Sequence, residues 1–161
     1  METSPSAPGS PDAVPSTQRI RWQAPDGEHP ARRISQASYA AVVAKDKDRW
    51  LGLFADDARL EDPVGPSFFD PEGAGHVGKE AIAAFWDMAI APVAEFTFTI
   101  RDSFANGNSC ANVGTFSTRM DDGTLADTEL VAVYRLDADG RIASMCAHWE
   151  VERTMATLRK A

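Results

Sequence analysis

The chain of 161 residues has no long apolar run and no cluster of lysine and arginine. A membrane-spanning helix needs about 20 consecutive apolar residues, and a nucleic-acid-binding surface normally concentrates basic residues. Here 24 acidic residues outnumber 16 basic ones, which gives a net charge of −8. We therefore expect neither a membrane nor a nucleic acid as a partner of this protein.

Cysteine is scarce as well. Only Cys110 and Cys146 are present, and their spacing fits no metal site or disulfide framework. The N-terminus lacks the charged and then apolar pattern of a secretion signal, so we expect free thiols and a cytoplasmic location. No motif for nucleophilic catalysis is present, and His76 and His148 share no metal-binding spacing. We expect neither a metal nor another cofactor.

Proline, by contrast, is concentrated at the N-terminus. Six of the ten prolines lie within the first 30 residues, among Ser, Thr and Gly. Such a segment buries too little apolar surface to offset the entropy that is lost on ordering. We therefore interpret residues 1–29 as a disordered tail, with a local contact at Ile20 or Trp22, and residues 30–161 as one folded domain.

The first half of this domain has helical patterns. A helix is predicted over Ala31–Lys45, and Asp46 or Asp48 can cap a second, short helix that carries Phe54. A third helix is stopped by Pro92. Its apolar stripe consists of Ile82, Phe85, Trp86 and Ile90.

The second half has the alternation of strands. Apolar residues alternate with threonine from Phe96 to Ile100, which is typical of a half-buried strand. Strands 111–119 and 124–136 flank the hairpin signal Asp122-Gly123, and a last strand, 141–151, follows another turn. This order predicts an α+β fold in which helices cover one face of a curved sheet and enclose a pocket.

A short strand between the helices ends at an acid. Ala58, Leu60 and Asp62 share one face of it, while Arg59 and Glu61 share the other. A carboxylate at the mouth of an apolar cavity suits a general base near neutral pH. Taken alone, an acid at a strand end more often accepts hydrogen bonds from loop amides, so the neighbouring sequence has to decide between the two roles.

Three blocks of sequence stand out: LFADDARLEDPVGP from Leu53, GKEAIAAFW from Gly78 and RLDADGRIASM from Arg135. With them, the stretch from Ser38 to Val151 resembles the ketosteroid isomerases of the NTF2-like (SnoaL-like) superfamily. The resemblance implies a cone of curved antiparallel sheet and three helices, a hydrophobic pocket for a flat polycyclic, steroid-like ligand, and a homodimer packed through the sheet. It also implies that a double bond of a 3-ketosteroid moves into conjugation through a dienolate.

The same resemblance assigns roles to individual residues. Asp62 matches the catalytic base, and Tyr39 matches the tyrosine that polarises the carbonyl if one residue is deleted near Lys45; without that gap Ser38 takes its place. Ala132 stands where the family has a second hydrogen-bonding acid, so half of the oxyanion hole is missing. The residues expected in the substrate pocket are Phe54, Trp86, Ala132, Met145 and Trp149.

Ala132 leaves the function open. The leading interpretation is a steroid delta-isomerase in which Asp62 shuttles the proton. A second is a non-catalytic binding protein for steroids or other hydrophobic small molecules. A third is another reaction of this fold, such as that of a lyase or cyclase, with the same base; epoxide opening would need an Asp-Arg-Asp group in the pocket, which the sequence does not place.

Two smaller features complete the sequence. The stretch Gly73–Gly78 spells G-x-G-x-x-G, but no strand precedes it and the sheet that follows is antiparallel, so a loop at the pocket rim is predicted rather than a nucleotide site. Phe68 and Phe69 in the same loop can either cap a ligand or pin the loop to the core. Glu129, Val131 and Val133 lie on the same strand as Ala132 but point to the other face of the sheet, where they suit a dimer interface.

Overall fold

The computed structural model describes residues 19–161, so most of the predicted disordered tail lies outside the described residues. The rest of that tail contains a strand: β1, Ile20–Trp22, runs parallel to β4, Glu95–Asn106, with Ile20 opposite Phe98. The suggested contact at Ile20 or Trp22 is thus a strand pairing. One strand, β1, therefore lies before the predicted boundary at residue 30.

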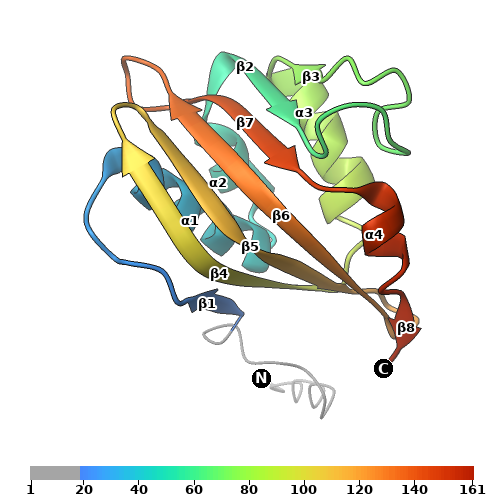
Figure 1. Ribbon diagram of the computed structural model, residues 1–161. Helices are drawn as coiled ribbons and strands as arrows, with labels where there is room; N and C mark the ends of the chain where they lie inside the picture. Colours follow the sequence, from blue (N-terminus) through green and yellow to red (C-terminus); the bar gives the residue numbers. More distant parts are fainter. Residues whose placement is uncertain (1–18) are drawn as a thin grey trace, which may run out of the picture.

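The helices follow the predicted order (Figure 1). They are α1, Pro30–Val43; α2, Lys47–Gly52; α3, Lys79–Phe85; and its π-helical continuation η2, Trp86–Ile90. Asp46 caps α2, because its carboxylate accepts a hydrogen bond from the Arg49 amide at 3.1 Å. Phe54 was expected in this helix but lies in β2, since α2 ends at Gly52. No helix within residues 19–161 is long and apolar enough to span a membrane.

The described chain forms a sheet of eight strands in the order β1-β4-β5-β6-β7-β2-β3, with β8 paired to β6. The predicted antiparallel meander is confirmed for β4 to β7. The edges differ from it, because β1 pairs in parallel with β4 and β2 pairs in parallel with β7. The remaining strands are β2, Phe54–Glu61; β3, His76–Val77; β5, Ser109–Arg119; β6, Thr124–Leu136; β7, Ile142–His148; and β8, Arg159–Lys160.

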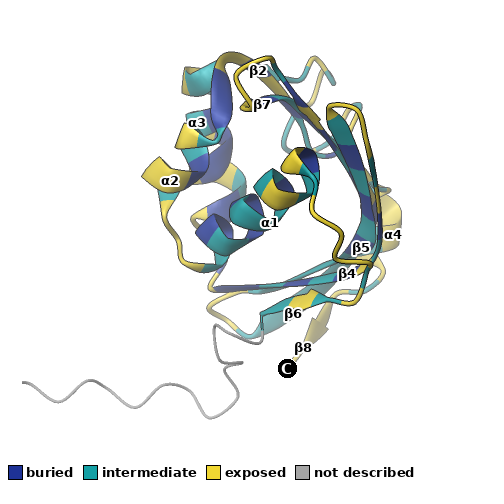
Figure 2. Ribbon diagram, turned by 90° about the vertical axis from the view of Figure 1, so that its left-hand side faces the viewer, coloured by how far each residue is buried: buried dark blue, intermediate teal, exposed yellow. Residues whose placement is uncertain are grey.

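The helices cover one face of the sheet, which curves around them (Figure 2). Tyr39 of α1 stacks on Phe98 of β4, with ring centroids 4.7 Å apart. Trp50 of α2 lies 5.2 Å from Trp86, again between ring centroids. Aromatic pairs of this kind contribute about 0.5–1.5 kcal/mol each beyond the area that they bury. The predicted α+β fold, with its helices on a curved sheet, is confirmed.

The C-terminal end differs most from the prediction. The last strand was expected to reach residue 151, but β7 ends at His148 and the chain turns into a short helix, α4, Val151–Met155. Strand β8 then lies antiparallel to the start of β6, with Arg159 opposite Leu125. The C-terminus therefore returns to the sheet at the hairpin end of β6 (Figure 1).

Candidate functional site

Two neighbouring chambers lie between the sheet and the helices. The outer chamber has a volume of about 290 Å³ and the inner chamber one of about 50 Å³. The two chambers, together called the cavity below, share the lining residues Asp62, Phe85, Ile90, Phe96 and Phe116. Among the described residues that line either chamber, Asp62 is the one charged side chain.

Asp62 is positioned by strand β2 and by Trp149. Ala58 and Leu60 are buried on the same face of β2, as predicted, and Asp62 follows directly after the strand, which ends one residue earlier than expected. The peptide bond from Asp62 to Pro63 is cis. Trp149 Nε1 donates a hydrogen bond to Asp62 Oδ1 at 2.6 Å, which fixes the carboxylate at the cavity wall.

The surroundings of Asp62 change its acidity. Burial raises the pKa of its carboxyl from the ordinary 3.8 to about 6, and the hydrogen bond from Trp149 acts in the opposite direction. The carboxylate is therefore ionised at neutral pH but more basic than a solvated one. A group with a pKa close to the working pH can take up and return a proton efficiently.

Tyr39 of α1 reaches the inner chamber from the helical side. It is 1% exposed, and its hydroxyl oxygen accepts a hydrogen bond from Asn112 Nδ2 at 2.9 Å and makes another with Tyr134. Burial raises the pKa of the Tyr39 phenol above its ordinary value, while these two hydrogen bonds lower it. Tyr39 is therefore a neutral hydrogen-bond donor at physiological pH. Ser38 lines the same chamber, where its hydroxyl oxygen accepts from Trp50 Nε1 at 3.2 Å.

The residues predicted for the substrate pocket divide into two groups. Three line the cavity: Phe54 and Met145 in the inner chamber, and Trp149 in the outer one. Trp86 and Ala132 are buried, but neither is among the described residues that line the two chambers. Trp86 packs against Trp50, and Ala132 of β6 lies opposite Asn112 of β5.

The sequence analysis did not identify two polar residues, one that lines the inner chamber and one that lies behind it. Tyr134 lines it from β6, and Asn112 lies behind Tyr39 on β5. Burial raises the pKa of Tyr134 well above the ordinary tyrosine value, and the neighbouring Tyr39 raises it further. The alternation of β6, in which Leu130, Ala132 and Tyr134 are buried, could have identified Tyr134. No local pattern marks Asn112, because its partner Tyr39 is 73 residues away.

The loop between β2 and β3 forms part of the rim of the outer chamber. Phe68 and Phe69 both line the outer chamber. Phe69 packs against Phe85 with ring centroids 5.8 Å apart, whereas Phe68 is 56% exposed. Phe69 therefore pins the loop to the core, while Phe68 lies at the mouth. An amide of the glycine motif is already hydrogen-bonded within the loop, because the Asp70 carboxylate accepts from the Gly75 amide at 2.7 Å. That amide is not free to bind a phosphate.

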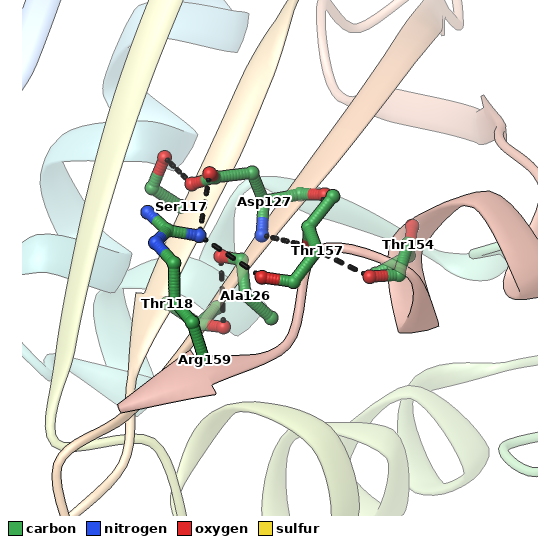
Figure 3. A network of polar contacts seen from close by, with 7 residues as sticks. All are labelled: Ser117, Thr118, Ala126, Asp127, Thr154, Thr157 and Arg159. Carbon is green, nitrogen blue, oxygen red and sulfur yellow. Dashed lines mark hydrogen bonds and ion pairs between the residues drawn. The ribbon is translucent and has the colours of Figure 1, made fainter. Parts of the chain in front are cut away.

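The C-terminal residues 154–160, here named the C-terminal clasp, close the far side of the outer chamber. Three residues of the clasp line the outer chamber, namely Thr154, Met155 and Leu158. Thr157 fastens the clasp to β6, because its Oγ1 accepts a hydrogen bond from the Asp127 amide at 2.8 Å (Figure 3). Arg159 pairs with the Asp127 carboxylate at 2.9 Å, and Ser117 donates to the same carboxylate at 2.8 Å. The sequence prediction missed this wall entirely.

The structure also locates the cysteines and possible metal ligands. Within residues 19–161, no group of three or more His, Cys, Asp or Glu side chains could hold a metal ion. Cys110 is buried, Cys146 is partly buried, and both are free thiols.

The sequence family can now be stated. The model of the SnoaL-like domain matches residues 35–145, which is more than half of the chain. The protein therefore belongs to the SnoaL-like family. Its fold and its structural neighbours make it a ketosteroid isomerase-like protein of the NTF2-like superfamily, as the resemblance in the sequence implied.

Solved structures agree with this assignment. RV0760c from Mycobacterium tuberculosis is similar with a TM-score of 0.75 and 31% identity, over 85% of this chain and 100% of that chain. The Delta 5-3-ketosteroid isomerase from Mycobacterium sp. has a TM-score of 0.74 and 31% identity, over 83% and 100%. A computationally designed 17-OHP binder has a TM-score of 0.75 and 29% identity, over 83% and 100%. A comparison with curated proteins returns no match.

Proposed function

We propose that this protein is a steroid delta-isomerase, which moves a double bond of a 3-ketosteroid into conjugation. The observation that carries the proposal is the position of Asp62. Its carboxyl, held by Trp149, lies where an apolar outer chamber meets an inner chamber that contains Tyr39. Two similar structures support the ligand class, since one is a ketosteroid isomerase and another is RV0760c in complex with estradiol-17beta-hemisuccinate.

In the proposed mechanism, the carbonyl of the ketone enters the inner chamber while the apolar rings occupy the outer one. The Asp62 carboxylate removes a proton from the carbon between the carbonyl and the double bond, and the electrons shift onto the carbonyl oxygen to give a dienolate. Tyr39 donates a hydrogen bond to that oxygen and stabilises its negative charge. The Asp62 carboxylic acid then returns the proton to the far carbon of the dienolate, which forms the conjugated ketone.

The direct test uses purified protein and a 5-ene-3-ketosteroid. Formation of the conjugated enone is followed by its ultraviolet absorbance, against buffer and against the Asp62→Asn variant as controls. Enone formation that depends on Asp62 supports the proposal. If the steroid binds and no enone forms above the buffer rate, the protein is not an isomerase of this substrate class.

A second candidate is a non-catalytic steroid-binding protein. Ala132 favours it, because the family's second oxyanion acid is replaced by a side chain that cannot donate a hydrogen bond. The similar designed protein is described as a 17-OHP binder, so binding of a small molecule is a function that this fold can serve. Tight binding of a planar phenolic steroid without turnover of the 5-ene-3-ketosteroid would favour this candidate.

Other reactions of the fold have less support. An LEH-like epoxide hydrolase from M. tuberculosis is 20% identical with a TM-score of 0.65, a likeness that shows the fold alone. Epoxide opening by an Asp-Arg-Asp group is disfavoured, because Asp62 is the one charged residue that lines the cavity in the described chain. A lyase or cyclase that uses the same base remains a minor alternative proposal.

We also propose a homodimer packed through the outer face of the sheet. Val131 is 37% exposed there, and Glu129, His148 and Arg153 line a hollow around it. The outer face of a sheet with exposed apolar residues can bury them against a second copy. Sedimentation at several protein concentrations tests this proposal. A cytoplasmic location stays a prediction from the sequence.

The proposed base predicts a pH dependence of kcat/KM. Because Asp62 must be ionised to accept a proton and its pKa is raised to about 6, activity should fall with decreasing pH around a midpoint near 6. The Trp149→Phe variant should move this midpoint upward by roughly one pH unit, since a hydrogen bond that favours the carboxylate is lost. A midpoint near the ordinary 3.8 would mean that the carboxyl is solvated.

The C-terminal clasp predicts an effect on ligand affinity. Thr157→Val keeps the shape of the side chain and removes the acceptor for the Asp127 amide. We expect estradiol-17beta-hemisuccinate to bind roughly three- to tenfold more weakly, as the loss of one hydrogen bond implies, and the Asp127 amide to exchange with solvent faster. Lys47→Ala removes the ion pair with Asp87, neither residue of which lines a chamber, and is the control. Equal effects of both variants would contradict a specific role of the Thr157 contact.

A further inference from the structure

A chain of polar groups extends from Tyr39 through strands β5 and β4 and returns to Arg32 near the start of the same helix, α1. Asn112 is 0% exposed and lies at its centre, on β5. Its Nδ2 donates to Tyr39 Oη at 2.9 Å and to Ser35 Oγ at 3.0 Å, and its Oδ1 accepts from Ser103 Oγ at 2.8 Å. Ser103 Oγ in turn accepts from Arg32 Nε at 3.0 Å. Asn112 Oδ1 also accepts a longer contact from the Cys110 thiol at 3.8 Å. Both N–H groups and the oxygen of the Asn112 amide are therefore used.

The direction of this chain is set by Arg32. A guanidinium can only donate hydrogen bonds, and Arg32 donates both to the Oγ and, at 3.1 Å, to the carbonyl oxygen of Ser103. The Ser103 hydroxyl must then use its own proton toward Asn112, which turns the Asn112 oxygen to Ser103 and its NH2 group to Tyr39. Ser35 is consistent with this orientation, because it donates its own proton to the Arg32 carbonyl at 2.7 Å.

The position of Asn112 relates it to the missing acid. In the register of the sheet, Asn112 lies directly opposite Ala132, the position at which the family's second acid was expected. Burying an amide side chain costs free energy unless all its groups are hydrogen-bonded, and core packing alone would be served by an apolar residue. The polar group that β6 lacks is thus supplied by the neighbouring strand, where it reaches Tyr39 rather than the chamber.

We propose that Asn112, oriented by Arg32 through Ser103, is a positioning residue that strengthens Tyr39 as a hydrogen-bond donor in place of the missing acid at position 132. This inference rests on the proposed function of Tyr39. A phenol whose oxygen accepts hydrogen bonds is a better donor through its own proton, and hydrogen bonds in series polarise one another. Tyr39 then needs less help from a second group that touches the ligand.

Two tyrosines are present in the whole chain, which makes the test direct. Both are replaced biosynthetically by trifluorotyrosine, whose phenol is far more acidic than that of tyrosine, and are titrated by fluorine NMR in the ligand-free protein; Tyr134→Phe assigns the two signals. Asn112→Leu should raise the pKa of residue 39 by about one pH unit, the effect of one lost hydrogen bond to the phenolate. Ser103→Ala should raise it less, because it interrupts the chain one step further away.

Ser35→Ala is the matched control, since it removes a hydrogen bond of the same Asn112 amide without interrupting the chain from Arg32 to Tyr39. It should leave the pKa of residue 39 unchanged. A shift in Ser35→Ala as large as that in Asn112→Leu would overturn the proposal, as would an unshifted pKa in both Asn112→Leu and Ser103→Ala. If Asn112→Leu does not fold, the comparison of Ser103→Ala with Ser35→Ala decides the question alone.

Kinetics separate this inference from the proposed function. In an active isomerase, Asn112→Leu should lower kcat about tenfold with little change in KM, because one hydrogen bond acts mainly in the transition state. If the natural protein turns over no 5-ene-3-ketosteroid, the proposed function fails. The titration of Tyr39 still decides whether Asn112 strengthens it as a hydrogen-bond donor. If turnover is present and the pKa of residue 39 does not shift, only the proposed role of Asn112 is overturned.

Discussion

The Asp62→Asn variant is expected to lose isomerase activity by about 10²–10⁴-fold, the usual contribution of a general base. Asparagine has nearly the same shape and can still accept the hydrogen bond from Trp149 Nε1. It cannot take up a proton, so the proton transfer between the two carbons has no carrier. The measurement is kcat/KM for a 5-ene-3-ketosteroid well above pH 6, where Asp62 is ionised.

The stability of the same variant provides an internal control with a defined sign. The raised pKa of Asp62 means that the folded state binds this proton more tightly than the unfolded chain between pH 3.8 and about 6. Ionisation therefore destabilises the fold as pH rises through this window. At pH 7 the Asp62→Asn variant should be more stable than the natural protein, by at most about 3 kcal/mol, and the difference should vanish as the pH falls below 3.8.

A variant that is inactive, folded and more stable at neutral pH would identify Asp62 as a group kept for chemistry at a cost in stability. Retention of activity within a few-fold would show that another group carries the proton. Loss of activity with loss of stability at neutral pH would instead mean that the Asp62 carboxylate holds the loop in place, which is the ordinary role of an acid at a strand end.

The sequence predicted the elements whose pattern is local. The alternation around Leu60 predicted the buried face of β2, which ends directly before Asp62, and the stripe from Ile82 to Ile90 predicted the third helix. Strands β4 to β7 were predicted because apolar and polar residues alternate along them or because Asp-Gly pairs mark their turns. The π-helical turn η2 could not be predicted, since its extra residue does not disturb the apolar spacing.

The missed parts depend on contacts across the chain. Strand β8 has two residues and α4 has five, too short for a periodic pattern. Ion pairs with Asp127 and Asp122 hold β8, and the ion pair of Arg153 with Glu129 of β6 holds α4. Asn112 looks like an ordinary strand residue until sheet register and α1 packing bring it to Tyr39. Such tertiary contacts are set by the whole fold and leave no signal within a short window.

The structure also bears on the choice between Tyr39 and Ser38. The sequence allowed either Tyr39 or Ser38 at the carbonyl-polarising position. Both line the inner chamber, and each hydroxyl oxygen accepts a hydrogen bond, from Trp50 at Ser38 and from Asn112 at Tyr39. The phenol of Tyr39 is the stronger hydrogen-bond donor, because a phenol is much more acidic than the aliphatic hydroxyl of a serine. Among the two, Tyr39 is the better candidate for the oxyanion donor.

The Tyr39→Phe variant is accordingly expected to lower kcat by about 10²–10³-fold, the usual cost of one oxyanion donor. Phenylalanine keeps the stacking on Phe98 at 4.7 Å between centroids, so the wall of the chamber is preserved. KM should change little, because the hydrogen bond strengthens mainly as charge develops on the carbonyl oxygen. The rate of enone formation under saturating steroid is the measurement.

Tyr134→Phe is the matched comparison, because Tyr134 lines the same chamber and hydrogen-bonds to Tyr39 without contacting Asn112 in the described network. If Tyr39 is the donor to the ligand, Tyr134→Phe should reduce kcat by much less than Tyr39→Phe. The reverse order would assign the oxyanion to Tyr134 and reduce Tyr39 to its support. Comparable large losses in both would mean that two phenols share the oxyanion, so that the acid absent at Ala132 is replaced from the same strand, two residues further along β6.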